Sequence, residues 1–97
     1  MPTFVIFSKI SPNKGVVQLK ERSQAVQKRL KAECPLVGFR EGYALDRGYE
    51  VLDIVEADTI DSVRQAAKII EQVDGATTEV VAAFPWREFV AGRSRAA

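Results

Sequence analysis

Two segments with the apolar spacing of amphipathic helices are separated by a pair of short strand-like segments, and this order constrains the fold most. β-Branched and aromatic residues mark the strands, and apolar residues spaced three and four apart mark the helices. In order, the segments are strand 3–10, a helix from about residue 23 to a stop at Pro35, strands 36–45 and 49–57, a helix from 60 to Gly75, and strand 76–84. This β-α-β-β-α-β order predicts a split βαβ arrangement.

The fold class that follows is α+β and ferredoxin-like, with a four-stranded antiparallel sheet. We expect both helices to cover one face, and the strands to lie in the spatial order fourth, first, third, second. The 97 residues hold one domain, residues 1–92, and a basic C-terminal tail, 93–97, that we expect to be frayed. Pro85 is expected to start a short helical turn, whose Trp86 and Phe89 cover a core edge or a dimer seam.

The overall charge excludes some classes of partner. The net charge is +1 and 28% of the residues are charged, which predicts neither a nucleic-acid nor a membrane partner. No apolar run approaches the roughly 20 residues that cross a bilayer, and the first residues lack the pattern of a signal peptide. Cys34 is the only cysteine, cannot form an internal disulfide, and is expected to be a buried structural residue. A cytoplasmic location is the resulting prediction.

Three stretches of the chain resemble the GYD-domain family: residues 1–6 (MPTFVI), residues 48–57 (GYEVLDIVEA), and the closing TTE and AFP of residues 77–85. The family-motif residues are Gly48, Tyr49, Glu50 and Glu56. Glu50 stands where the family usually has aspartate, and Asp58 where proline is common. The resemblance implies a dimeric α+β barrel, hence a homodimer or higher homo-oligomer with a cavity between each sheet and its partner. It implies no established activity.

Alternation along the strands predicts which residues share a face of the sheet. The more purely apolar set is expected to face the helices: Phe4, Ile6, Leu52, Ile54, Val80 and Ala82. The other face is expected to carry Val5, Phe7, Lys9, Tyr49, Val51, Asp53, Val55 and Glu79, with Glu41 and Tyr43 if no bulge shifts the register near Gly38 and Gly42. A mostly apolar wall with a few polar groups is typical of a small-molecule pocket.

Asp53 is the candidate acid or base on that open face. It lies mid-strand between apolar neighbours, so burial should raise its pKa. Tyr49 or Tyr43 could donate a hydrogen bond to a carbonyl oxygen, and Lys9 could balance an anion. The candidate catalytic residues are Asp53 and Tyr49; the candidate ligand-binding residues are Phe7, Lys9, Glu41, Tyr43 and Glu79. A structural role for Asp53, paired with Lys9 or with a donor across a dimer, remains the alternative.

Absent residue types narrow the chemistry further. The chain has no histidine, which excludes a Ser-His or Cys-His dyad and a His-bearing zinc site, and no glycine-rich phosphate loop. We therefore predict neither a metal nor a cofactor. One function consistent with these residues is a small-molecule-binding homodimer with its pocket on the open sheet face, which could act as a cofactor-free enzyme on a carbonyl compound. The alternative is a non-catalytic regulatory or accessory subunit that docks on a larger complex.

Overall fold

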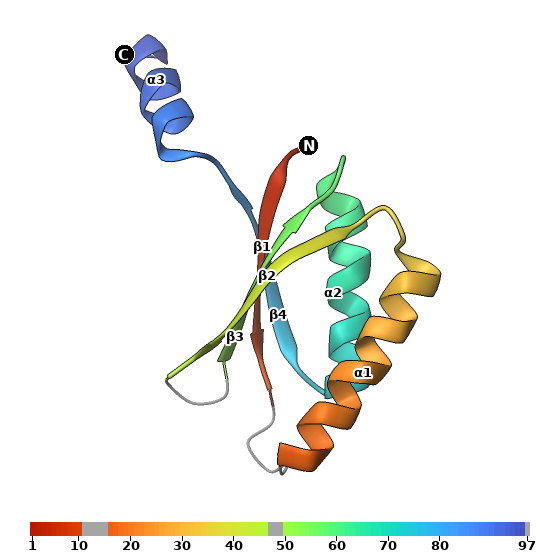
Figure 1. The fold of residues 1–97 in the computed structure, drawn as a ribbon. Coiled ribbons are helices and arrows are strands. Elements are labelled where there is room, and N and C mark those ends of the chain that lie inside the picture. Colours follow the sequence, from red (N-terminus) through yellow and green to blue (C-terminus); the bar gives the residue numbers. More distant parts are fainter. Residues whose placement is uncertain (11–15, 47–49, 97) are drawn as a thin grey trace.

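The computed structural model describes residues 1–10, 16–46 and 50–96. Figure 1 shows an antiparallel four-stranded sheet with two helices, α1 and α2, against one face and a third, α3, beyond the sheet. The elements are β1 (Thr3–Lys9), α1 (Val16–Glu33), β2 (Gly38–Leu45), β3 (Glu50–Glu56), α2 (Ile60–Asp74), β4 (Thr77–Ala83) and α3 (Trp86–Ala96). The strand order β2-β3-β1-β4 confirms the predicted topology.

Helix α2 has the termini that its sequence predicts. The Thr59 side chain accepts a hydrogen bond from the Ser62 backbone N–H at 3.3 Å, which caps the first turn. At the other end, Gly75 adopts a left-handed conformation with φ 61°, and its N–H donates to the Glu71 carbonyl at 2.9 Å. The apolar stripe between these caps is buried against β1 and β4: Val63, Ala66, Ala67, Ile69 and Ile70. This half of the sheet is the best-packed part of the molecule.

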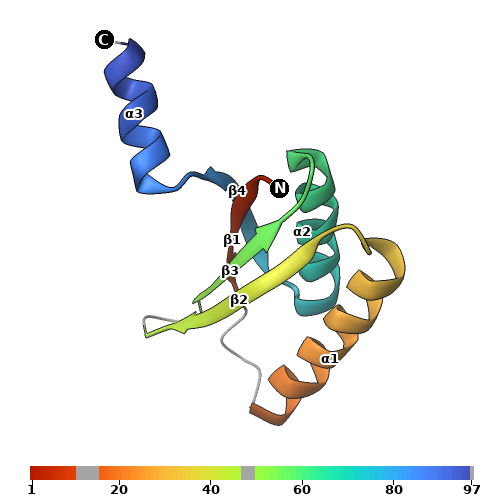
Figure 2. The same cartoon turned by 45° about the horizontal axis from the view of Figure 1, so that its top comes forward.

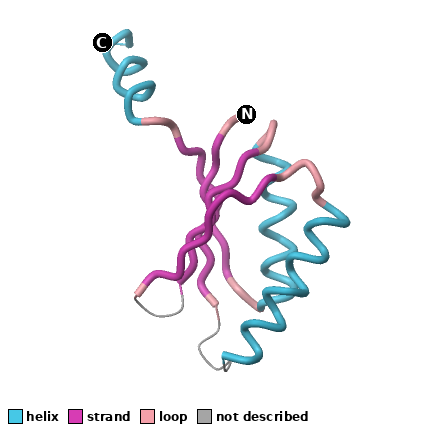
Figure 3. The backbone as a smooth tube through the Cα atoms, viewed as in Figure 1, coloured by secondary structure: helices cyan, strands magenta, loops and turns pink. Residues whose placement is uncertain are grey.

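Helix α1 is longer than predicted and packs mainly on α2, not on the sheet. It begins at Val16, where the sequence places its regular part only from about Ser23. Val26 and Leu30 are buried in the shared core, and Arg29 Nη1 donates to Gln72 Oε1 of α2 at 2.9 Å. Figure 3 shows α1 as the outer of the two helices, farther from the strands than α2. The space between α1 and strands β2 and β3 is therefore incompletely filled.

The predicted face of β3 is wrong. Val55 pairs with Phe4 and is fully buried, so it faces the helices, and Asp53, opposite Ile6, lies on that face with it. Directly opposed residues of neighbouring strands share a face. Leu52 and Ile54 therefore lie on the open face, opposite Phe7 and Val5. Both residue sets of β3 are apolar, so alternation within this strand could not decide between them.

The β-bulge anticipated in β2 is present, and the structure defines the register of β2 against β3. The pairing shifts between Phe39 and Glu41, which leaves Arg40 as the extra residue. Phe39 then pairs with Val55 on the helix face, and Tyr43 pairs with Leu52 on the open face. The bulge therefore sets which β2 residues face the helices.

Helix α3 is a full helix that projects away from the domain, not a short turn on its edge. Figure 2 shows it connected to β4 and separated from both other helices. Trp86 is 76% exposed and stacks on Phe89, with ring centroids 5.9 Å apart. The expectation that Trp86 and Phe89 cover a core edge of the same chain is thus wrong. No helix in the described part of the chain is long and apolar enough to span a bilayer.

Candidate functional site

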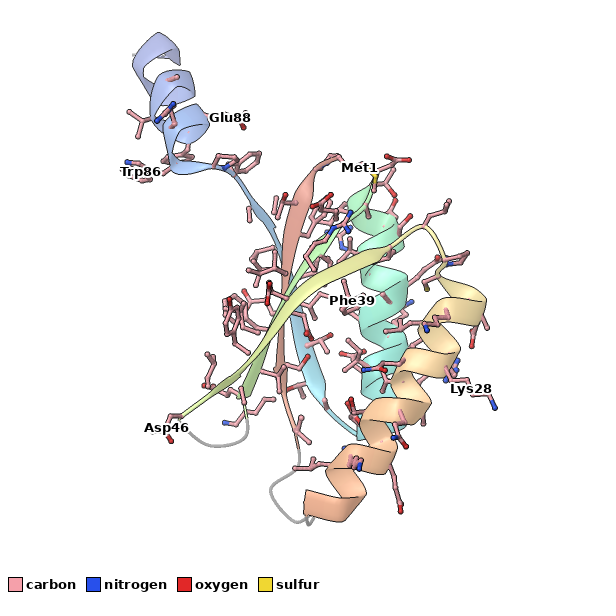
Figure 4. All side chains as sticks on the ribbon, viewed as in Figure 1. Met1, Lys28, Phe39, Asp46, Trp86 and Glu88 are labelled. Carbon is pink, nitrogen blue, oxygen red and sulfur yellow. The ribbon has the colours of Figure 1, made fainter. Side chains whose placement is uncertain are left out.

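A cavity of about 850 Å³ lies between α1 and the β2–β3 half of the sheet. Its walls are mainly apolar and come from both layers: Ile10, Leu19, Val26, Leu30, Val37, Phe39, Val51 and Ile70. Figure 4 shows Phe39 in the space between β2 and the helices. The volume lies within the range of small-molecule sites, roughly 300–1,000 Å³. The cavity exists because α1 leans on α2 and not on β2 and β3.

Asp53 brings a carboxyl group into this cavity from the middle of β3. Burial raises its pKa to about 6, and the negative charge of Asp74 adds to the effect. Its neighbour on β2 is Gly42, where a side-chain Cβ would lie only 2.9 Å from Asp53 Oδ1. Glycine at position 42 thus leaves the room that the carboxyl group occupies. The group is poised near neutral pH, as a general acid or base requires.

Asp74 and Arg22 form an ion pair at the same end of the cavity. Arg22 Nε lies 3.3 Å from Asp74 Oδ1, and both side chains are largely buried. Asp74 borders the cavity; burial raises its pKa, and the Arg22 charge opposes that rise. The Nη1 and Nη2 atoms of Arg22 have no hydrogen-bond partner in residues 1–10, 16–46 or 50–96. The ion pair therefore leaves buried donors unsatisfied, which is rare in folded proteins.

Ser8 is a second unsatisfied polar residue of the cavity wall. It lies in β1 on the helix face, is 4% exposed, and its Oγ has no hydrogen-bond partner within the described part of the chain. Ile6, two residues earlier on the same face, is directly opposite Asp53. Ser8 and Asp53 are thus diagonal neighbours on one side of the sheet.

The five predicted ligand-binding residues lie on the other side of the sheet. Phe7 pairs with Leu52 and Glu79, Lys9 lies at the end of the same face, and Tyr43 also pairs with Leu52. Phe7, Lys9 and Glu79 border a smaller hollow of about 440 Å³. Glu41 pairs with Ile54 beside the bulge and also borders the larger cavity from the sheet edge. The structure therefore brings these five onto one face, and of the five only Glu41 also borders the cavity that holds Asp53.

The residues of the family-like motif have mixed positions. Gly48 and Tyr49 lie outside the described residues, so the predicted role of Tyr49 stays a prediction. Glu56 forms an ion pair with the bulge residue Arg40, whose Nε lies 3.1 Å from Glu56 Oε1. Glu50 lies at the start of β3, half-buried, opposite Lys9. The ion pair gives Glu56 a structural role.

The sequence analysis did not identify three polar residues at or beside the cavity, although each breaks a local pattern: Ser8 and Asp74 border the cavity, and Arg22 pairs with Asp74. Ser8 is the one polar member of an apolar alternation with Phe4 and Ile6. Arg22 interrupts the apolar spacing of α1, and Asp74 places a negative charge in the last turn of α2, where the helix dipole disfavours it. Such exceptions in otherwise regular patterns are a usable signal for a polar site. In the described part of the chain, no group of three or more acidic, cysteine or histidine residues is placed to bind a metal ion.

Comparisons with known proteins identify the fold alone. No family model matches the chain, and no curated protein matches it. Three solved structures show the likeness. The SCO4226 protein of Streptomyces coelicolor A3(2) has a TM-score of 0.54 and 16% identity, with 82% of this chain and 94% of that protein covered.

The second structure is a candidate antibiotic biosynthesis monooxygenase of Caulobacter crescentus CB15, with a TM-score of 0.54 and 11% identity, covering 87% of this chain and 92% of that one. The third is a de novo designed protein with a ferredoxin fold, LFR1 1, with a TM-score of 0.53 and 17% identity, covering 89% and 88%. A designed protein among the matches shows that the geometry alone accounts for the likeness. The chain therefore has a ferredoxin-like fold.

Proposed function

We propose that this protein is a small-molecule-binding domain that holds an apolar ligand between α1 and the sheet and acts as a homodimer. The observation that carries the proposal is the cavity of about 850 Å³, whose mainly apolar walls also carry polar groups, Ser8, Asp53 and Asp74 among them. Sites for small molecules combine these two features, because the apolar surface supplies affinity and the few polar groups fix orientation. The ligand site is thus on the helix-covered face, opposite to the face that alternation favours.

The same proposal includes acid–base chemistry on a carbonyl compound. With a pKa of about 6, Asp53 is mostly ionised at pH 7 and can accept a proton from a carbon next to a carbonyl group. The aspartic acid formed in this step can return the proton to another carbon of the same molecule, which completes an isomerisation. The similarity of residues 1–6 and 77–85 to GYD-domain proteins, together with the ferredoxin-like fold, supports placing the chain in that family.

Filling the cavity should abolish ligand binding. Naphthalene is a suitable probe because it is flat, apolar and uncharged, and we expect saturable binding by the wild-type protein in a fluorescence titration. Ser23 borders the cavity from α1, so Ser23→Trp should weaken naphthalene binding at least about tenfold by occupying the space. The exposed Gln24 is not among the bordering residues, and Gln24→Trp should leave binding unchanged. Equal binding by both variants would contradict the proposed site.

The homodimer explains the composition of the open sheet face. Phe7 is 39% exposed and Tyr43 51% exposed, and the half-buried Leu52 lies between them. The half-buried Val5 and Ile54 form the neighbouring row, and no helix covers this face. An apolar sheet face requires a second layer. A second copy of the chain, facing sheet to sheet, supplies an equally apolar surface.

A negative charge on this face should dissociate the dimer. We expect twice the chain mass for the wild type in light scattering at micromolar concentration and the single mass for Leu52→Glu, because burying an unpaired carboxylate costs several kcal/mol. Lys68→Glu, an equally charged change on the exposed side of α2, should remain dimeric. A monomeric wild type would contradict the dimer.

A second candidate function is favoured by α3. This helix carries exposed aromatic and aliphatic side chains away from the domain (Figure 4), with Trp86 76% and Val90 41% exposed. Such an arm is typical of an accessory subunit that docks on a larger complex. The Trp86→Ser variant tests whether α3 packs on a second copy of this chain or on a different protein. If α3 packs on the second copy, the variant dimer should dissociate at lower dilution than the wild-type dimer in light scattering. An unchanged dimer would favour docking on a different protein.

A further inference from the structure

Ser8 and Asp53 occupy diagonal positions on one face of the sheet, and both border the cavity. Diagonal neighbours on adjacent antiparallel strands have Cβ atoms roughly 7 Å apart. Both side chains reach beyond their Cβ atoms, so one oxygen atom could bridge such a gap with two hydrogen bonds of about 2.8 Å each. The spacing fits one ligand hydroxyl group between the two side chains.

The hydrogen-bonding capacities of the two residues define that group. Ser8 Oγ is buried without a hydrogen-bond partner in the described residues and can donate one hydrogen bond. The ionised Asp53 carboxylate only accepts. A ligand group that satisfies both must accept from Ser8 and donate to Asp53 through the same oxygen. A hydroxyl group does this, whereas a ketone oxygen or an ether cannot donate.

The remaining cavity defines what carries the hydroxyl group. Helix α1 contributes Leu19, Val26 and Leu30 to the cavity wall, together with the polar Ser23, Gln27 and Lys31. Phe39 and Val51 extend the apolar surface along the sheet. A hydroxyl on an apolar carbon skeleton suits both the Ser8–Asp53 pair and this apolar surface. Asp53 itself disfavours a carboxylate or phosphate in place of the hydroxyl, because like charges repel.

We infer that Ser8 and Asp53 form a two-point site for the hydroxyl group of a phenol or enol on an apolar body. The inference rests on the proposed ligand cavity and names its ligand class and a binding residue, Ser8, for it. An enol is the tautomer of a carbonyl compound, so the same two contacts would hold the product of proton abstraction by Asp53. Ser8 thereby orients the oxygen while Asp53 handles the proton.

A pair of probes that differ only in the hydroxyl group tests this inference. The dissociation constants of 2-naphthol and naphthalene are measured for the full-length wild type, Ser8→Ala and Asp53→Asn. Placing a hydroxyl in an apolar cavity without partners carries a desolvation penalty, so 2-naphthol binds more tightly than naphthalene only if it finds hydrogen bonds. We expect this preference in the wild type. We expect Ser8→Ala to reduce the ratio of the two constants about fivefold or more, in line with the loss of one buried hydrogen bond.

The ratio of the two dissociation constants distinguishes a ligand-binding role of Ser8 from a structural role. If Ser8 only supports the fold, Ser8→Ala would weaken both probes equally and leave the ratio unchanged. Thr78→Val is the matched control, since Thr78 lies opposite Ser8 in β4, donates to Glu71 at 3.0 Å, and does not border the cavity. Naphthalene binding without a preference for 2-naphthol, or a preference that survives Ser8→Ala, would overturn the two-point site and leave the proposed cavity standing. Failure of both probes to bind would overturn both.

Discussion

Replacing Val55 by aspartate is expected to unfold the protein, whereas the same change at Ile54 is not. Val55 is fully buried between β3 and the helices, and it pairs with the buried Phe4. An unpaired carboxylate there costs several kcal/mol, which is comparable with the whole stability of a small domain, about 5–15 kcal/mol. Ile54 lies one residue earlier on the open face, opposite Val5. Its replacement puts the charge on the side of the sheet that α1 and α2 leave uncovered.

Circular dichroism of the two variants measures this difference. Val55→Asp should lose the cooperative thermal transition, and Ile54→Asp should keep it at a somewhat lower midpoint. The two positions are adjacent in the same strand and receive the same residue, so each is the control for the other. The opposite result, with Ile54→Asp unfolded and Val55→Asp folded, would show that β3 has the face predicted from alternation.

Asp53→Asn is expected to stabilise the protein above neutral pH. The folded-state pKa of Asp53, about 6, is higher than the ordinary value of 3.8, because burial and the Asp74 charge disfavour the carboxylate. The protonated form is therefore the one that folding favours. The stabilisation from this site is fully present below about pH 4 and is lost as the pH rises through about 6. The asparagine of the Asp53→Asn variant has no charge to bury, so the variant does not lose this stabilisation as the pH rises.

The size of the effect follows from the difference between the two pKa values. In a fully desolvated site this difference corresponds to about 3 kcal/mol; because the cavity is partly open to water, we expect about 1–2 kcal/mol. For a domain of this length, that raises the melting temperature by roughly 4–16 °C. Thermal melts between pH 4 and 8 should show the variant and the wild type converging at the acid end and separating above pH 6.

Two comparisons complete the experiment. Asp58→Asn, at an exposed position before α2, should follow the wild-type curve. Asp74 also has a raised pKa, so the Asp53→Asn variant keeps part of the pH dependence. The quantity to measure is therefore the difference between the wild-type and variant curves. A wild type more stable than Asp53→Asn at pH 8 would show that a counter-charge holds the carboxylate, which is the structural role considered from the sequence.

Features that depend only on residues close to one another in the sequence could be predicted from it. Thr59 and Gly75 define the ends of α2 because a capping hydroxyl and a left-handed glycine act within one helical turn. Phe4 and Ile6 could be placed on the buried side of β1 because the other side of this strand begins and ends with the polar Thr3 and Lys9. The order of the strands followed from the β-α-β-β-α-β succession.

The candidate site depended on long-range relations and was only partly predicted. Asp53 was identified correctly as a half-buried acid with a raised pKa, but its face was not, because Val51 and Val55 are as apolar as Leu52 and Ile54. Only pairing with β1 decides between two such sets. The residues that border the cavity with Asp53 come from β1, α1 and α2 as well as from the sheet edge, and no local pattern brings those elements together.

The sequence by itself thus determined the β-α-β-β-α-β order of strands and helices, because this order rests on the periodicity of each segment and on the residues that end each segment. The tertiary structure decided where the unfilled space lies. Helix α1 buries its stripe against α2, and the half of the sheet under β2 and β3 is left with a cavity. Whether a helix packs on the sheet or on its neighbouring helix depends on side chains from several elements at once. For this reason Ser8, Asp53 and Asp74 come to border the same cavity only in the folded chain.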